Sequence, residues 1–213
     1  MPNPYWPLFD LVIRTPRLEI RLPSDDILVE LVRLASAGIH DPEDMPFAIP
    51  WTDASSPDLE RSALQWWWHQ RAAWSPKDWT FAGAVLVDGI PVGVQDLAAR
   101  DVATLRSVGT GSWLGRAFQG LGIGQEMRAA VLHLAFAGLG AAEAHSGAWH
   151  DNRPSLAVSR KLGYEDNGSD LRLRRDVADR HISLRLTRDG WRAGRRGDIE
   201  LLGLDGCRAM FGA

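Results

Sequence analysis

The chain has 213 residues, of which 45% are hydrophobic and 24% charged, and its formal net charge is −3. This composition is typical of a globular protein with a full hydrophobic core, and the near-neutral charge gives no electrostatic sign of a nucleic-acid partner. The single cysteine, Cys207, excludes an internal disulfide and favours a reducing compartment. No apolar run is long enough to cross a bilayer, and the proline-rich N terminus lacks the pattern of a signal peptide. We therefore expect a cytoplasmic protein with no membrane partner.

No internal repeat or linker interrupts the chain, so we expect a single domain over residues 1–213. Residues 1–10 would form an N-terminal arm over the surface, and residues 192–213 a C-terminal extension. Apolar alternation predicts a first strand at 17–23. Residues Leu28, Leu31, Val32 and Ala35 then mark the buried face of a helix that ends at Gly38.

The rest of the chain alternates between strand and helix patterns. A loop with three prolines covers 40–51, and a helix rich in tryptophan follows at 58–74. The remaining predicted strands lie at 79–87, at 90–97, before Gly115, at 142–148, at 170–175 and at 181–186. Helices are predicted directly after Gly124 and at 154–162. This order predicts an α+β, or mixed α/β, fold.

A glycine-rich turn at 119–124 stands between a strand and a helix. Such a turn exposes backbone N–H groups at the positive end of the helix dipole, where a phosphate binds readily. A Walker loop is excluded because no lysine is near. A dinucleotide fingerprint needs a third glycine where Gln125 or Met127 stands, so a dinucleotide-binding oxidoreductase is only a minor alternative. A turn without any ligand is the other alternative.

Two spaced motifs resemble the GNAT acetyltransferase superfamily. Gln119-Gly120-Leu121-Gly122-Ile123-Gly124 matches Gln/Arg-x-x-Gly-x-Gly/Ala, the acyl-CoA pyrophosphate loop of that superfamily. The segment 152–164, from Asn152 to Leu162-Gly163-Tyr164, resembles its next helix. Trp113-Leu114-Gly115 and Thr15-Pro16-Arg17-Leu18 are similar to segments of the Rim-type subgroup, which acetylates ribosomal-protein N termini.

The resemblance implies a mostly antiparallel, twisted sheet with a splayed central strand pair and flanking helices. It also implies a co-substrate, acetyl-CoA or another short acyl-CoA such as succinyl-CoA, and direct attack by an amine in a ternary complex. No metal is expected. The residues implied to hold the CoA are Trp113, Leu114, Gln119, Gly120, Leu121, Gly122, Ile123, Gly124, Asn152 and Ser155. Asn152 could instead only cap the helix.

The catalytic acid departs from the superfamily pattern. Many members carry a tyrosine seven residues after the asparagine, where it protonates the departing thiolate, and Ser159 stands at that position here. Ser159 is therefore the predicted acid. A serine is a weak proton donor, so a non-catalytic module that senses a CoA ligand is an alternative. Tyr164 is expected to pack in the core.

The acceptor site is the part of the predicted active site that the sequence indicates least specifically. By resemblance, the loop 40–51 forms one wall of the acceptor site, and its residues Met45, Phe47 and Trp51 are the predicted contacts. The acceptor could be a protein N terminus, a protein lysine or a small amine. Candidate general bases are His40, Glu43, Asp44, Asp96, His145, His150 and Asp151. A homodimer is also compatible with the ten tryptophans and the C-terminal extension.

Overall fold

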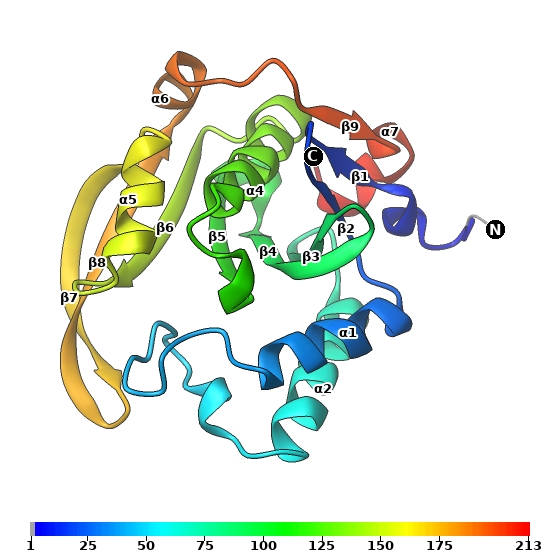
Figure 1. The fold of residues 1–213 in the computed structure, drawn as a ribbon. Helices are drawn as coiled ribbons and strands as arrows, with labels where there is room; N and C mark the ends of the chain where they lie inside the picture. The colour runs from blue at the N-terminus through cyan, green and yellow to red at the C-terminus, as the bar shows by residue number, and fades with distance from the viewer. Residues whose placement is uncertain (1–2) are drawn as a thin grey trace.

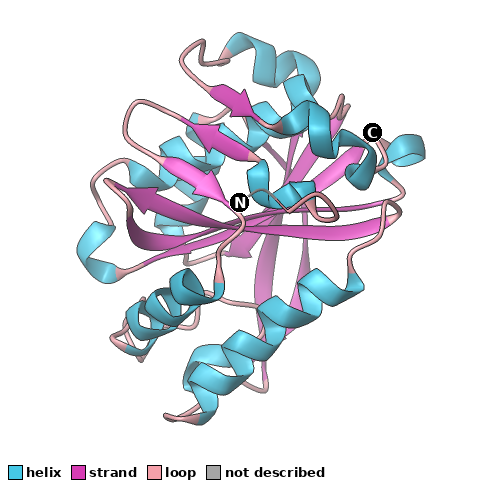
Figure 2. Ribbon diagram, turned by 90° about the vertical axis from the view of Figure 1, so that its right-hand side faces the viewer, coloured by secondary structure: helices cyan, strands magenta, loops and turns pink. Residues whose placement is uncertain are grey.

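The computed structural model describes residues 3–213, which build one nine-stranded sheet with helices on both faces (Figures 1 and 2). The strand order is β7-β8-β6-β5-β4-β3-β2-β1-β9, and only β5 and β6 pair in parallel among these strands. The strands are β1 Val12–Arg14, β2 Glu19–Arg21, β3 Asp78–Val87, β4 Ile90–Arg100, β5 Ser107–Leu114, β6 Glu143–Trp149, β7 Glu165–Arg174, β8 Val177–Thr187 and β9 Glu200–Leu202. The predicted α+β fold, mostly antiparallel, is confirmed.

The helices divide between the two faces of the sheet. The α-helices are α1 Asp25–Ser36, α2 Asp58–Ala73, α3 Val102–Leu105, α4 Ile123–His133, α5 Arg153–Lys161, α6 Arg188–Ala193 and α7 Leu204–Cys207. Short 3-10 or π turns are η1 Pro7–Asp10, η2 Trp51–Asp53, η3 Arg116–Phe118, η4 Leu134–Gly138 and η5 Arg208–Phe211. One hydrophobic core joins α4 and α5 to the sheet, and a second joins α1 and α2 to the opposite face. We call these the α4 face and the α1–α2 face.

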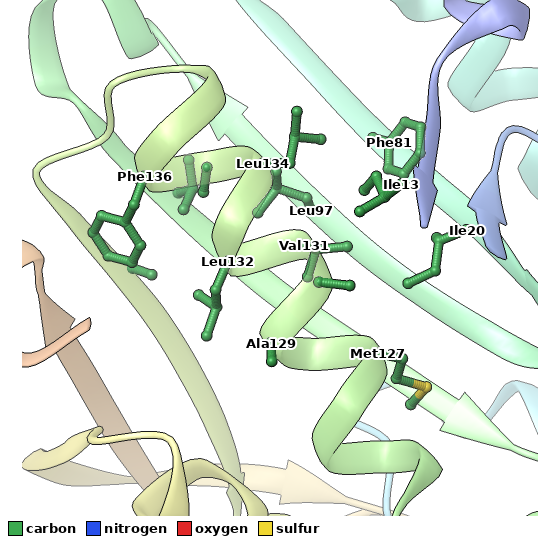
Figure 3. Close-up of a cluster of buried hydrophobic side chains, with 14 of the residues drawn as sticks. Ile13, Ile20, Phe81, Leu97, Met127, Ala129, Val131, Leu132, Leu134 and Phe136 are labelled. Carbon is green, nitrogen blue, oxygen red and sulfur yellow. The ribbon is translucent and has the colours of Figure 1, made fainter. Parts of the chain in front are cut away.

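Helix α4 is buried nearly all round, which is typical of a helix in the centre of a domain. Figure 3 shows Met127, Val131 and Leu134 directed toward the strands that carry Ile20 and Leu97. On its other side, Ala129, Leu132 and Phe136 are also buried. A polar side chain on this helix therefore has little access to water, which becomes important at Arg128 below.

The parallel pairing of β5 with β6 is short. It covers three residue pairs and ends at Gly109 and His145, whereas β5 stays paired with β4 as far as Leu114 and β6 with β8 as far as Trp149. The two strands diverge beyond that point in Figure 1. We call this unpaired stretch the splay. The predicted splayed pair of central strands is therefore present, between β5 and β6.

The N-terminal segment differs from the expected surface arm, and the C-terminal extension packs on the body of the protein. Leu8 in η1 is fully buried, and β1, which the sequence analysis missed, pairs with β9 of the C-terminal extension. Trp74 and Trp79 donate indole hydrogen bonds to the carbonyls of Met210 and Phe211, both at 2.9 Å. The extension thus completes the sheet and the core. Within residues 3–213, no helix is both long and apolar enough to cross a membrane.

Strands β7 and β8 are longer than predicted. The predicted ranges were 170–175 and 181–186; β7 begins earlier, at Glu165, and ends at Arg174, and β8 extends at both ends, from Val177 to Thr187. Almost every residue of β7 is exposed, so the strand has no buried face and no apolar alternation to mark its ends.

Candidate active site

The loop 119–124 has the geometry of an anion-binding turn. Gly120 and Gly122 adopt φ of 75° and 80°, a left-handed conformation that favours glycine. Among the described residues, the N–H groups of Gly120, Leu121 and Gly122 have no hydrogen-bond acceptor, and α4 begins directly afterwards at Ile123. Free N–H groups at a helix N terminus bind phosphates well. The predicted CoA residues of this loop therefore lie together.

Gly124 is different from the other two glycines of the loop, because its φ is not positive. A Cβ at Gly124 would meet only Leu114 Cδ1, at 3.7 Å. Neither its backbone conformation nor close packing therefore requires a glycine at this position.

Buried Glu126 anchors the first turn of α4. Thr15 Oγ1 donates to Glu126 Oε1 at 2.6 Å, and Arg17 Nε donates to Glu126 Oε2 at 2.7 Å. Arg17 Nη1 also donates to the carbonyl of Leu121 at 3.1 Å. The segment 15–18, which the sequence analysis matched to the Rim-type pattern without a role, therefore holds the glycine loop in place.

Gln119 supports the loop through its side chain. Its Nε2 donates to the carbonyls of Ile39 and Leu114, at 2.7 and 2.9 Å. The backbone N–H of Gln119 donates to the Arg116 carbonyl. Gln119 is thus engaged within the protein, and the carbonyl of Leu114, a residue that the resemblance implies holds CoA, already accepts a hydrogen bond.

Asn152 and Ser155 lie at the start of α5. Asn152 Oδ1 accepts a hydrogen bond from the Ser155 backbone N–H at 3.2 Å, so the side chain caps the helix. The capping alternative for Asn152 is therefore present in the structure. A contact from either residue to CoA stays a prediction.

Ser159 is fully buried and belongs to a network around Arg128. Arg128 Nη1 donates to Ser159 Oγ at 2.8 Å and to Ser146 Oγ at 3.2 Å, and Arg128 Nη2 donates to Ser112 Oγ at 2.9 Å. The Ser159 hydroxyl in turn donates to the carbonyl of Ser155 at 3.1 Å. To protonate a thiolate, this hydroxyl would first have to leave the Ser155 carbonyl. Ser159 as the acid stays a prediction that this geometry does not favour.

Asp96 occupies the α1–α2 face directly opposite Gly111 of β5. A Cβ at Gly111 would lie 3.5 Å from Asp96 Oδ2, so the absence of a side chain there leaves room beside the carboxyl group. Asp96 Oδ1 is buried and has no hydrogen-bond partner within residues 3–213. Burial raises the pKa of Asp96 to about 7. A carboxyl group with that pKa is suited to accept a proton near neutral pH.

Four of the other candidate bases are engaged with protein partners, whereas Glu43 and Asp44 are exposed on the loop 40–51. His40 contacts the Asp41 carbonyl and Thr52 Oγ1, and His145 lies 2.9 Å from Glu143. His150 lies 3.1 Å from Asp179, and Asp151 pairs with Arg174. Asp96 is therefore the candidate with both a free acceptor atom and a raised pKa.

An aromatic wall joins the loop 40–51, which we call the acceptor loop after its predicted role, to β5. The ring centroids of Phe47 and Trp51 are 5.4 Å apart, and those of Trp51 and Trp113 are 6.2 Å apart. Trp113 pairs with Val94, two residues from Asp96, so it shares the α1–α2 face with the carboxyl group. The structure therefore brings Phe47, Trp51 and Trp113 together, and of these Trp113 stands on the same sheet face as Asp96.

Met45 does not belong to this wall. Its side chain is only 2% exposed, and its carbonyl accepts a hydrogen bond from Arg174 Nε at 2.8 Å. Met45 therefore packs within the protein here, and a contact from Met45 to the acceptor stays a prediction.

Arg128 is the residue that the sequence analysis missed. It stands among apolar neighbours in the predicted motif helix, and no motif marks it. The signal that could have found it is a charged residue at position 128 within an otherwise apolar stretch of the predicted helix. No group of His, Cys, Asp or Glu side chains within residues 3–213 is arranged to hold a metal ion.

Comparison with known proteins identifies the class. The family model described as an acetyltransferase (GNAT) domain matches residues 17–165. This chain belongs to the GNAT acetyltransferase family.

Solved structures share its fold at low sequence identity. RimJ of Mycobacterium smegmatis, in complex with CoA-disulfide, is 20% identical with a TM-score of 0.66, and the match covers 91% of this chain and 98% of that one. RimL, a ribosomal L7/L12 alpha-N-protein acetyltransferase in complex with coenzyme A, is 17% identical with a TM-score of 0.65 over 84% and 99%. A GCN5-related N-acetyltransferase of Brucella melitensis is 16% identical with a TM-score of 0.66 over 85% and 80%.

Proposed function

We propose that this protein transfers an acetyl group from acetyl-CoA to an amine at the splay, and that Asp96 is the general base. The observation that carries the proposal is the joint position of three features: the N–H groups of the glycine loop, the splay between β5 and β6, and the Asp96 carboxyl group beside Gly111. The first would hold the donor, the second would admit its arm, and the third would serve the acceptor.

Different residues of the chain would bind different parts of CoA. The N–H groups of Gly120, Leu121 and Gly122 and the first turn of α4 would hold the pyrophosphate of CoA. The free edge of β5 near Trp113 would line its arm, with Asn152 and Ser155 on the opposite side. The thioester supplies an acyl carbon that an amine can attack directly.

The chemistry needs one proton acceptor on the amine side. An N-terminal amine has a pKa near 8, so a base with a pKa near 7 is adequate. Asp96 would take the proton, directly or through one water, as the amine nitrogen forms the C–N bond and the C–S bond breaks. This proton path lies on the α1–α2 face, where the aromatic wall would contact the acceptor.

The acceptor class is part of the proposal. Rim-like structural neighbours and the aromatic wall of Phe47, Trp51 and Trp113 support a protein N terminus, whose first side chain would contact the rings. A protein lysine or a small amine are the competing acceptors. Acetyl-CoA is the proposed donor, with succinyl-CoA as the competing one.

The test combines binding with turnover. Calorimetry with CoA, acetyl-CoA, succinyl-CoA and NAD measures donor binding, and free-thiol release is measured with peptides, blocked lysine and small amines. Acetyl-CoA binding with release that depends on a peptide N terminus supports the proposal. Binding without release from any amine would indicate a CoA-sensing module, and absence of CoA binding would refute the assignment of the loop.

A further inference from the structure

Arg128 is a buried cation without an anionic partner. Its side chain projects from α4, the residue is only 4% exposed, and no carboxylate within residues 3–213 forms an ion pair with it. Its hydrogen-bond acceptors are three serine hydroxyls, and its Nε is buried with no partner at all. Buried arginines are ordinarily matched by a carboxylate or phosphate, because an isolated buried charge is costly.

The charged groups around Arg128 do not supply the missing anion. On the same helix, the Glu126 carboxylate is held by Thr15 and Arg17. Among the residues that influence the pKa of the guanidinium, Tyr164 is the titratable neighbour, and burial raises the pKa of its phenol, so it stays neutral near pH 7. The guanidinium itself stays protonated at any pH used with proteins.

Arg128 lies next to the splay. Its three serine partners come from β5, β6 and α5, the elements that border the splay on the α4 face. One of them, Ser159, stands where the superfamily pattern has the tyrosine that serves the departing thiolate. The guanidinium therefore lies within one hydrogen bond of the place where negative charge would develop in acyl transfer.

We propose that Arg128 is a catalytic residue that stabilises the thiolate of CoA as it leaves the acyl group. The inference rests on the proposed function. As the C–N bond forms, the electron pair of the C–S bond goes to sulfur, and Arg128 holds that anion by charge. The amine proton goes to Asp96, so no proton needs to come from Ser159.

Ser112, Ser146 and Ser159 act as positioning residues in this arrangement. Three fixed hydroxyls hold the planar guanidinium at the splay without neutralising it, whereas a carboxylate in any of these positions would cancel the charge. This explains why a serine replaces the family tyrosine at 159. A tyrosine would supply a proton there, and the arginine supplies a permanent positive charge.

The experiment measures the thiol pKa of CoA bound to the protein, from the ultraviolet absorbance of the thiolate during a pH titration. A thiol of this kind has a pKa near 8.5 when free. In the native protein we expect the bound thiol to titrate at least about one pH unit lower, which corresponds to about tenfold tighter binding of the thiolate than of the thiol.

Variants of Arg128 distinguish the effect of its positive charge from an effect on the fold. Arg128→Met should return the bound thiol to its free pKa or above, and Arg128→Lys should restore part of the shift. At pH 8, Arg128→Met should weaken CoA binding more than acetyl-CoA binding, because only CoA carries a thiolate. Arg100→Gln, which breaks an exposed ion pair with Asp78, is the control that should change neither quantity.

The native protein alone can overturn the proposal. If CoA binds by calorimetry but its thiol titrates at the free value, Arg128 does not stabilise the thiolate, even if Arg128→Met fails to fold. An Arg128→Met variant that loses affinity only for acyl-CoA with a terminal carboxylate would also overturn it. Absence of any CoA binding would instead refute the proposed function.

Discussion

Asp96 and Arg128 carry opposite charges on opposite faces of the sheet, and both lack a counterion. Asp96 lies over Gly111 on the α1–α2 face, and Arg128 contacts Ser112 on the α4 face. Acyl transfer removes a proton from the amine and leaves electrons on the sulfur. A carboxyl group on the acceptor side and a guanidinium on the donor side match these two requirements.

Burial of Asp96 should make the stability of the protein depend on pH. The folded-state pKa of about 7 is above the usual value of an aspartate, so the stabilising protonated form is fully populated at low pH and is lost as the pH rises through 7. Asp96→Asn should therefore be more stable than the native protein at pH 8, by roughly 1–3 kcal/mol. The difference should be largely absent at pH 4.5. Denaturant titrations at the two pH values measure it, and a constant difference would show that the pKa is not raised.

Gly124 offers a test of the CoA loop without backbone strain. Gly124→Val should weaken CoA binding by about tenfold or more, because the side chain would occupy the start of α4 where the phosphates are expected. The matched control is Gly206→Val, another helical glycine with open space around it. Calorimetry measures CoA affinity, and thermal unfolding verifies the fold. Unchanged affinity in Gly124→Val would place the CoA elsewhere.

At the residue scale, the spacing of sequence motifs predicted where candidate functional residues stand, but not which side chains they contact. The glycine loop and Ser159 could be found because their backbone conformation and order along the chain are local properties. The contacts of Arg128 could not, since they join three elements that are distant in sequence and an arginine is usually solvent-exposed. The pKa of Asp96 depends likewise on which strand lies opposite it.

At the scale of elements, the acceptor loop is fastened to the β7–β8 hairpin. Arg175 donates to both carboxylate oxygens of Asp53, at 2.6 and 2.7 Å, and Arg174 donates to the Met45 carbonyl. Arg175 and Asp176 have positive φ, as the central residues of a tight hairpin turn often do. The turn therefore presents Arg175 to the loop and fixes the aromatic wall.

Breaking this ion pair should affect the acceptor more than the fold. Partly exposed ion pairs contribute at most about 1 kcal/mol to stability, so Arg175→Gln should unfold almost as the native protein does. With the loop released, the KM for a peptide acceptor should rise several-fold, while CoA affinity is unchanged. Arg160→Gln breaks a comparable pair with Asp166 away from the loop and serves as the control. Equal KM values in both variants would argue against a role of the loop in acceptor binding.

Local apolar patterns determine which helices and strands could be predicted from the sequence. Apolar residues marked helices α1 and α2, and their predicted positions agree closely with the structure, as does the predicted start of α4 beside Gly124. Strands β1 and β9 have three residues each, and their pairing joins the two ends of the chain. No local sequence pattern predicts that β1 pairs with β9.

At the scale of the whole molecule, the C-terminal extension is part of the core although it lies outside the residues matched by the family model. Phe211 is fully buried, and its ring contacts Trp74 and Trp79 edge-on at centroid distances of 5.3 and 4.8 Å. Both tryptophans also donate to carbonyls of this segment. The extension therefore closes the end of the sheet opposite to β7.

Removal of the Phe211 ring should be costly. Phe211→Ala should lower the free energy of unfolding by about 3–5 kcal/mol, as expected for a large aromatic side chain in a packed core. Leu202→Ala, in the exposed part of β9, should cost less than about 1 kcal/mol. Denaturant titrations of the two variants make the comparison. Similar losses would mean that the extension only covers the surface.

The most direct test of the account is the pH dependence of amine-dependent thiol release from acetyl-CoA, compared between the native protein and Asp96→Asn with the same peptide acceptor. The comparison cancels the titration of the acceptor amine. We predict that the ratio of the native kcat/KM to that of Asp96→Asn falls about tenfold per pH unit below pH 7, because only the native protein loses its base there. Above pH 7, Asp96→Asn should be slower by roughly 10²-fold while it still binds CoA. Superimposable pH profiles and rates for the two proteins would contradict the assignment of Asp96 as the base.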